Sequence, residues 1–328
     1  MVIQWFPGHM AKATREVKEK LKLVDIVFEL VDARCPLSSH NMYLDEVVKD
    51  KKKIIIFNKI DLCDRKETAK WKNYFENKGY VVVYTDAKNS NNLNKVIDKA
   101  KEELAEKIAR QVAKGIKPRA IRSMVIGVPN VGKSTFINKL IELTSGDKNV
   151  ITTSHFPGTT LGMIEIPLDR ATSIYDTPGI ILDYDIAHYL DAKSLKLVMP
   201  KKEIKARVFQ LNAEQSLFFG GMARMDFVKG ERQSFTLYAS NLVEIHRTKL
   251  SNADALFEKH LGQMLKPPFE DNISIFGKQV RKSFKIDNRK TDIVISGLGW
   301  ITVNSDSGCE IDILVPDEIE VFVRESII

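Results

Sequence analysis

The stretch Gly127-Val128-Pro129-Asn130-Val131-Gly132-Lys133-Ser134 decides the fold class. It fits the pattern G-x-x-x-x-G-K-S/T, and it stands between an apolar run at 123–126 and a helical pattern at 133–143, as a phosphate-binding loop requires. Glycines let backbone N–H groups wrap around phosphates, and a helix N-terminus adds a favourable potential for anions. We expect Lys133 to pair with the β- and γ-phosphates and Ser134 to bind Mg²⁺. The residues expected to contact the nucleotide here are Pro129, Asn130, Val131, Gly132, Lys133, Ser134 and Thr135.

Apolar runs alternate with helical patterns over the first part of the chain. The runs lie at 25–31, 53–57, 81–84 and 123–126, and a long charged helical pattern covers 92–114. This alternation predicts a parallel α/β sheet. Beyond about residue 200, short β-like runs dominate, at 207–209, 235–238, 293–295, 313–315 and 320–323, with one helical segment at 252–265. We therefore predict an α/β domain over residues 1–196 and a smaller β-rich domain over 197–328.

A base-reading motif, Asn58-Lys59-Ile60-Asp61, directly follows the apolar run at 53–57. In an NKxD motif the Asp61 carboxylate would accept from guanine N1–H and the exocyclic amine, whereas adenine presents the wrong donors. The Lys59 stem would cover one face of the base. Ligands bind outside the carboxyl ends of strands in open α/β sheets, so the placement of the motif supports this interpretation.

A second phosphate-sensing region follows the phosphate loop. Asp176-Thr177-Pro178-Gly179 fits DxxG, with Asp176 as an outer carboxylate for Mg²⁺ and the Gly179 N–H facing the γ-phosphate. Upstream, Phe156-Pro157-Gly158-Thr159-Thr160 resembles a switch I segment. We expect Thr160, or alternatively Thr159, to contact Mg²⁺ and the γ-phosphate, so that hydrolysis releases the segment.

The order of these motifs narrows the family. GTPases usually run from the phosphate loop through switch I and DxxG to NKxD, whereas here NKxD comes first. In this the chain resembles the circularly permuted GTPases of ribosome assembly. The resemblance implies a base loop at Thr85-Asp86-Ala87-Lys88, although Asp86 stands where the family has Ser. Ala87 could still offer its N–H to guanine O6, with Lys88 beside it.

The resemblance has two parts that together cover nearly the whole chain. Residues 1 to about 140 resemble the RbgA (YlqF) family, through 5–13 (WFPGHMAKA), 31–34 (VDAR) and 117–122 (KPRAIR). Residues from about 145 to 328 resemble the YqeH family, through 150–160 (VITTSHFPGTT), 217–221 (LFFGG), 245–249 (IHRTK) and 296–300 (SGLGW). We expect neither the zinc-binding segment of YqeH-like proteins nor the helical rRNA-binding domain of RbgA-like proteins. The chain is therefore expected to be a hybrid family member or two joined parts.

Hydrolysis is expected to be slow without an activator. Ile180 follows DxxG, where Ras-like proteins place a glutamine that orients water. The resemblance implies two sources of help: His9 as a catalytic group, and Asn130 as a ligand for K⁺, which would supply positive charge. The expected catalytic residues are His9, Lys133 and Thr160.

Composition and charge bear on partners and compartment. The 328 residues carry a net charge of +7, which fits a ribosomal RNA partner. We expect no membrane span and no leader, and the three cysteines form no CxxC pair, so we expect a cytoplasmic protein with no zinc site. His40, His188 and His260 are expected to be surface or structural residues, and Phe218-Phe219 to be core. Candidate RNA contacts are Lys12, Arg15, Lys18, Lys20, Lys22, Arg247, Lys249, Lys278, Arg281 and Lys282.

Together these features predict a GTP- and GDP-binding, GTP-hydrolysing factor that acts on a pre-ribosomal subunit. The small subunit is favoured because the β-rich part is YqeH-like, and the large subunit is the alternative. A monomer is expected, with no DNA partner. The main rival is a GTP-dependent RNA-binding switch with negligible hydrolysis of its own.

Overall fold

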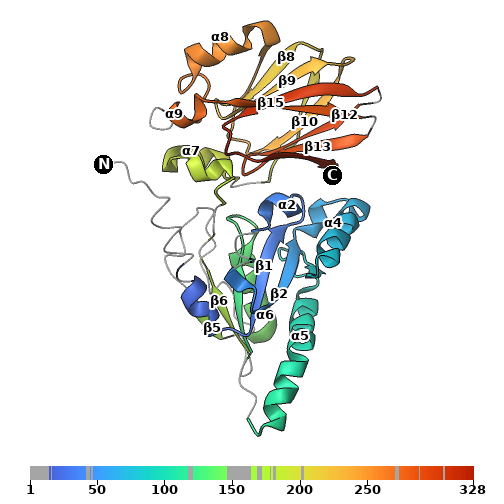
Figure 1. Cartoon of the computed structure of the whole chain (residues 1–328), viewed down its shortest axis with the longest axis vertical. Coiled ribbons are helices and arrows are strands. Elements are labelled where there is room, and N and C mark those ends of the chain that lie inside the picture. Colours follow the sequence, from blue (N-terminus) through green and yellow to red (C-terminus); the bar gives the residue numbers. More distant parts are fainter. Residues whose placement is uncertain are drawn as a thin grey trace, which may run out of the picture. The chain divides into compact units, whose positions relative to one another are not determined.

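The structure is a computed structural model, and it describes residues 15, 17–41, 45, 47–116, 121–145, 164–167, 172–177, 179, 182–200, 203–269, 273–287, 289–305 and 307–328. These residues form two compact units (Figure 1). The first unit takes in the described residues up to Gly179 together with Ile327 and Ile328. The second takes in the described residues from Leu182 to Ser326.

The first unit contains one sheet with the strand order β3-β2-β1-β4-β6-β5. The first five of these strands are parallel, and β5 is an antiparallel edge. The strands are β1 (Ile26–Asp32), β2 (Lys52–Asn58), β3 (Val81–Tyr84), β4 (Ile121–Ile126), β5 (Ile164–Pro167) and β6 (Thr172–Asp176). The helices are α2 (Pro36–Ser39), α4 (Arg65–Asn77), α5 (Leu93–Ala113) and α6 (Lys133–Ser145), with a 3-10 turn, η1 (Ile60–Leu62). The predicted parallel α/β sheet is confirmed.

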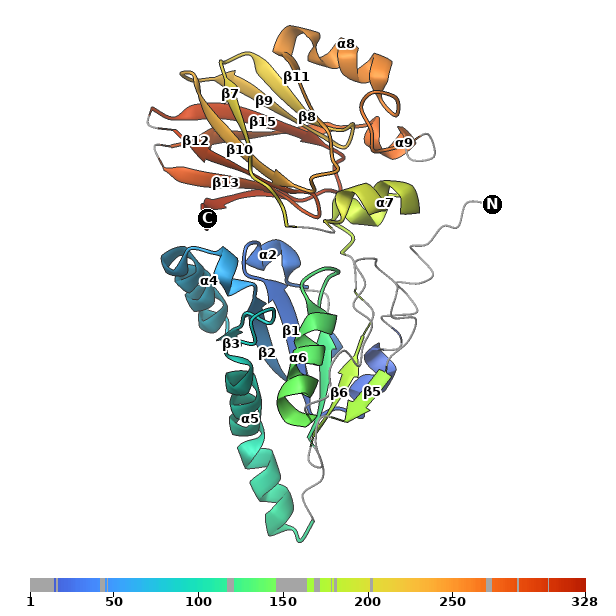
Figure 2. The same ribbon diagram turned by 180° about the vertical axis from the view of Figure 1, so that it is seen from behind.

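Helices cover both faces of this sheet. Phe75 of α4 packs with Val31, Ile55 and Val82. Phe136 of α6 meets Phe28 on the other face, with ring centroids 6.5 Å apart, because successive strand residues point to opposite sides. Accordingly α6 lies behind the sheet in Figure 1 and in front of it in Figure 2. Burial on both faces explains why the central strands are continuous apolar runs.

The second unit is β-rich, as the sequence predicts. One antiparallel sheet has the order β16-β13-β14-β10-β7, and the other has the order β11-β8-β9-β15-β12. Phe227 of one sheet meets Phe235 of the other, with ring centroids 5.0 Å apart, so the two sheets share a core. The strands are β7 (Arg207–Leu211), β8 (Gln215–Phe219), β9 (Ala223–Lys229), β10 (Gln233–Ala239), β11 (Ile245–Lys249), β12 (Val280–Ile286), β13 (Lys290–Ile295), β14 (Gly299–Asn304), β15 (Cys309–Val315) and β16 (Val321–Glu325). The helical elements are η2 (Ile186–Tyr189), α7 (Ala192–Val198), α8 (Leu250–His260) and α9 (Ile273–Phe276).

Two boundaries differ from the sequence-based expectations. The helix expected at 252–265 ends at His260, because Gly262 takes a left-handed φ of 76° and two prolines follow at 267 and 268. Residues 182–196, expected in the first domain, belong to the second unit. Backbone hydrogen bonds hold them there: Ile186 N–H donates to Ser296 O (3.0 Å), and Glu320 N–H donates to Tyr184 O (3.1 Å). Phe218 and Phe219 are buried, so their assignment to the core is confirmed.

Candidate nucleotide site

The motif loops leave one edge of the first sheet. NKID begins at the last residue of β2, Thr85 follows β3, the phosphate loop follows β4, and Asp176 ends β6. All four strands are parallel, so their carboxyl ends share an edge. Ligands of open α/β sheets bind at this edge. The topology therefore brings together motifs that are far apart in the chain.

The phosphate loop depends on backbone shapes that a side chain would prevent. Gly127 has φ of 147°, and a Cβ there would stand 2.5 Å from Leu30 O. Gly132 has φ of 100°, and a Cβ there would stand 2.5 Å from Asn58 Nδ2. Asn130, with φ of 63°, takes the left-handed conformation without being glycine. These positions explain why the loop needs its two glycines.

Lys133 is buried at the start of α6. Its ammonium donates to Gly127 O (2.9 Å) and Val128 O (3.0 Å). Burial lowers the pKa of Lys133 to about 8, and the Asp176 carboxylate opposes this shift. A nucleotide phosphate would compete with the two carbonyls for the ammonium and favour its charged form.

Asn58 connects three loops. Its Nδ2 donates to Val131 O (2.8 Å) in the phosphate loop. Its Oδ1 accepts from Ala87 N–H (3.0 Å) and from Thr85 Oγ1 (3.3 Å) in the base loop. The side chain is buried, so each bond stands in place of a hydrogen bond to water. Asn58 therefore sets the spacing between the base-reading and phosphate-binding halves of the site.

Lys59 makes a second connection to the phosphate loop. Its Nζ donates to Asn130 O (2.7 Å) and to Asp32 Oδ2 (2.8 Å). Asp32 also accepts from Arg34, and these two cations hold the pKa of its carboxyl far below the usual range despite burial. Sequence reasoning assigned no role to Asp32 or Arg34. The available signals were a carboxylate at the end of a largely apolar strand and its place in the 31–34 (VDAR) stretch.

The base loop closes on Asp86. Its carboxylate accepts from Asn89 N–H (3.1 Å), Asn89 Nδ2 (2.6 Å) and Asn91 Nδ2 (3.2 Å). Asp therefore has a local function at the position where the permuted family has Ser. The Ala87 N–H, expected on guanine O6, donates to Asn58 here, so it would have to exchange that partner to reach a base.

The remaining described site residues line the same edge. A Cβ at Gly179 would stand 3.0 Å from Pro129 Cγ and 3.2 Å from Lys133 Nζ, so the DxxG glycine lies against the phosphate loop. Thr177 Oγ1 donates to Val125 O (2.7 Å). Asp176 is buried, Ser134 and Thr135 are half-buried, and Asp61 and Lys88 are exposed. The edge thus carries a cation, hydroxyls and carboxylates suited to a phosphate with Mg²⁺.

Three predicted site residues, His9, Thr159 and Thr160, lie outside the described residues, as does Lys12. Two of the residues predicted to contact RNA have partners within the protein. Lys282 Nζ donates to Ile319 O (2.6 Å) and Asp317 O (3.3 Å), and Arg281 Nε lies 3.4 Å from an oxygen of Asp312. Lys282 therefore has a local structural contact that its charge alone did not indicate.

One group among the described residues has the composition of a metal site, namely Glu29, His40 and Asp45. His40 Nδ1 lies 3.0 Å from Glu29 Oε1, and His40 Nε2 lies 3.2 Å from Asp45 Oδ2. Lys53 pairs with both carboxylates. Burial lowers the pKa of His40, but the hydrogen bonds that its ring donates to the carboxylates of Asp45 and Glu29 raise this pKa to about 9. Two cations thus balance two anions, and His40 is structural, one of the two alternatives expected for it.

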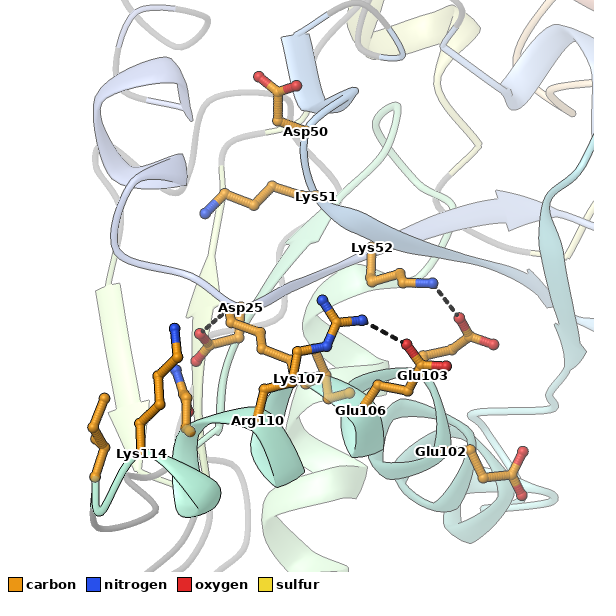
Figure 3. A pocket seen from close by; sticks show the side chains of 13 residues that line it. Asp25, Asp50, Lys51, Lys52, Glu102, Glu103, Glu106, Lys107, Arg110 and Lys114 are labelled. Atoms are coloured by element: carbon orange, nitrogen blue, oxygen red, sulfur yellow. Dashed lines mark hydrogen bonds and ion pairs between the residues drawn. The ribbon is translucent and has the colours of Figure 1, made fainter.

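A pocket of about 800 Å³ opens at the opposite end of β1 and β2 from the motif loops. Figure 3 shows its charged lining, in which pairs form between Lys52 and Glu103 (3.2 Å), Lys107 and Asp25 (2.9 Å), and Arg110 and Glu106 (2.8 Å). Because these cations are paired with carboxylates, the pocket offers little net charge to a nucleotide.

The fold and the site define a phosphate-loop α/β domain joined to a β-sandwich unit. A family model described as 50S ribosome-binding GTPase matches residues 122–218, and one described as YqeH-like, C-terminal, matches residues 232–327. Ribosome biogenesis GTPase A of Thermotoga maritima is 33% identical over 210 residues, which are 63% of this chain and 71% of that protein. The chain therefore belongs to the family of ribosome biogenesis GTPase A.

Two further relatives match with higher identity. A Bacillus subtilis protein named Uncharacterized protein YqeH is 55% identical over 204 residues, which are 62% of this chain and 56% of that protein. Ribosome biogenesis GTPase A of Bacillus licheniformis is 48% identical over 181 residues, which are 55% of this chain and 62% of that protein. The chain thus spans less than two thirds of the length of these two relatives. Among the described helices, none has the length and apolar character needed to span a bilayer.

Proposed function

We propose that this chain binds GTP with Mg²⁺ and hydrolyses it, acting as a circularly permuted GTPase on a pre-ribosomal subunit. One observation carries the proposal: Asn58 Nδ2 donates to Val131 O at 2.8 Å, joining a base-reading motif to a phosphate loop 73 residues further along the chain. A guanine-reading loop and a phosphate loop held at fixed spacing are what a GTP site requires. The names of the relatives support the ribosomal role.

The permuted order is supported by the chain path. NKID follows β2 and the phosphate loop follows β4, yet both open at one edge of a single sheet. We further propose a hybrid origin, with an RbgA-like first part and a YqeH-like second part. The matches to ribosome biogenesis GTPase A, to YqeH and to the YqeH-like C-terminal model support this origin.

The residues divide the chemistry as follows. Mg²⁺ would be held by Ser134, Thr160 and Asp176 and would neutralise the charge of the phosphates. Asn130 would be a ligand of K⁺. Asp61 and Lys59 would hold guanine, with Ala87 and Lys88 beside it. The backbone N–H of Gly179 would contact the γ-phosphate. His9 and Lys133 would assist hydrolysis.

The proposed partner is ribosomal RNA in a pre-ribosomal particle, the small subunit being favoured by the YqeH-like second part. The protein would act in the cytoplasm as a monomer. A second candidate function is a GTP-dependent RNA-binding switch with negligible hydrolysis of its own. It is favoured by Ile180, which cannot orient a water by hydrogen bonding.

GTP hydrolysis in KCl and in NaCl, with purified small or large subunits or with neither, tests the proposal. Stimulation by one subunit and by K⁺, abolished in Lys133→Ala, would support the ribosome-coupled enzyme and identify its particle. Tight GTP binding without stimulated turnover would favour the switch. Equal affinity for ATP and GTP would overturn the guanine assignment.

A further inference from the structure

Asp32 is an acidic residue at the candidate nucleotide edge, within the 31–34 (VDAR) stretch to which no chemical role was assigned. It ends β1, the strand between β2 and β4, and its side chain is 8% exposed. Its Oδ1 accepts from the backbone N–H of Arg34 (3.0 Å) and from Arg34 Nε (2.9 Å). Its Oδ2 accepts from Arg34 Nη2 (2.7 Å) and from Lys59 Nζ (2.8 Å). The bidentate pair with Arg34 fixes the orientation of the carboxylate.

Lys59 is constrained at its backbone and at its ammonium. It takes the left-handed conformation, with φ of 62°, which a non-glycine residue adopts only where its surroundings impose it. Its Nζ is shared between Asp32 Oδ2 (2.8 Å) and Asn130 O (2.7 Å). The four-carbon stem between these fixed ends therefore has little freedom, although 27% of the side chain is exposed.

We infer that Asp32, held by Arg34, is a positioning residue for guanine nucleotide binding: its carboxylate fixes the Lys59 ammonium against the phosphate loop, so that the Lys59 stem is a preformed surface for the base. The inference rests on the proposed function and extends its base-binding half. Fixing the stem beforehand removes the entropy cost of ordering a long side chain when the base arrives.

Electrostatics makes the same carboxylate hard to replace. Arg34 and Lys59 both contact Oδ2 of Asp32, so without the carboxylate two cations would face each other in a largely buried place. Their repulsion would drive the Lys59 ammonium toward solvent. Asn130 O alone would then hold Lys59, because the neutral carbonyl attracts an ammonium less strongly than a carboxylate does.

The test is a double-mutant cycle on the full chain, read by the affinity for a fluorescent GDP analogue. Asp32→Asn keeps the shape and one acceptor oxygen while removing the charge, and Asp32→Ala removes both. We expect either change to weaken GDP binding about ten-fold or more, as for the loss of a charge-assisted hydrogen bond. In a Lys59→Ala background the same changes should have little further effect, because Asp32 acts through Lys59.

Asp25→Asn is the matched control. Asp25 immediately precedes β1, at the end opposite to Asp32, is 8% exposed, and pairs with Lys107 Nζ at 2.9 Å. The substitution should lower the stability of the first unit, measured by hydrogen exchange of β1 peptides, without changing GDP affinity.

Additive effects of the Asp32 and Lys59 substitutions, or wild-type affinity in Asp32→Asn, would overturn the inference while leaving the proposed function intact. If the unaltered chain binds no guanine nucleotide, the proposed function fails, and the inference fails with it. If Asp32→Ala does not fold, Asp32→Asn decides the question alone, with its circular dichroism spectrum as the check on folding.

Discussion

Replacing Asn58 with alanine tests whether one side chain holds the nucleotide site together. The amide makes three hydrogen bonds, to Val131 O, Ala87 N–H and Thr85 Oγ1, at 2.8, 3.0 and 3.3 Å. It is 3% exposed, and its alanine replacement could satisfy none of these groups. The substitution should therefore loosen the base loop and the phosphate loop together.

The expected cost follows from the groups left behind. The Thr85 hydroxyl can rotate to another acceptor, but Val131 O and Ala87 N–H are backbone groups fixed by their loops. A buried polar group that loses its partner costs about 1–3 kcal/mol. Two such groups give about 2–6 kcal/mol, and water entering the space left by the amide would bring the value toward the lower end. GDP affinity should fall at least ten-fold, because both halves of the site move.

Stability of the first unit is best measured by hydrogen exchange of peptides from β1 and β2 in increasing urea. The chain has two units that need not unfold together, so a global melt would mix their signals. GDP affinity comes from fluorescence titration of the same samples.

Thr85→Val is the matched control for Asn58→Ala. It removes the longest of the three bonds and leaves both backbone groups paired, so it should cost about 1 kcal/mol or less. If Asn58→Ala cost no more than Thr85→Val and bound GDP normally, the argument that Asn58 links the loops would be refuted.

Three further predictions concern pH and the phosphate loop. GDP affinity should fall as pH rises through about 8, because burial lowers the pKa of Lys133 to that value and binding needs the charged ammonium. Calorimetry in buffers of different ionisation enthalpy should show proton uptake on GDP binding at pH 9. The pKa of His40 is raised to about 9, so the charged imidazole stabilises the first unit fully below a pH of about 6.5, and this stabilisation is lost as pH rises through 9. In His40→Gln, the unfolding of the first unit in urea, followed by hydrogen exchange, should lose this pH dependence. Gly132→Ala should weaken nucleotide binding at least ten-fold while the circular dichroism spectrum stays unchanged. The new Cβ would stand 2.5 Å from Asn58 Nδ2, and the alanine would have to adopt a positive φ. Unchanged affinity would contradict the close approach of the two loops.

Much of the first unit could be predicted because its signals are local. A strand buried on both faces is largely apolar along its length, so the runs at 25–31, 53–57 and 81–84 matched β1, β2 and β3. In the second unit, the weaker alternation of half-buried strands indicated β7, β10, β13, β15 and β16, whereas β8, β9, β11, β12 and β14 were not predicted as separate strands. Alternating strands carry polar residues that local patterns cannot distinguish from loops.

The sequence by itself determined the order of the motifs and indicated which residues we propose to carry the chemistry. Gly127 and Gly132 are recognisable because the phosphate loop needs backbone conformations that glycine adopts readily. Both glycines lie within one stretch of eight residues, so the pattern can be seen in the sequence. NKID is recognisable because the residues proposed to bind one base are consecutive in the chain.

Only the tertiary structure decided which of these residues meet. Asn58 contacts Val131 73 positions away, and Lys59 contacts both Asp32 and Asn130, because parallel strands β1, β2 and β4 are neighbours in the sheet and open at one edge. Strand order is set by the packing of the whole sheet, so it cannot be predicted from the spacing of motifs along the chain. For that reason Asp32 and Arg34, which the sequence marked only through the resemblance of 31–34, are placed beside the proposed nucleotide site only by the fold.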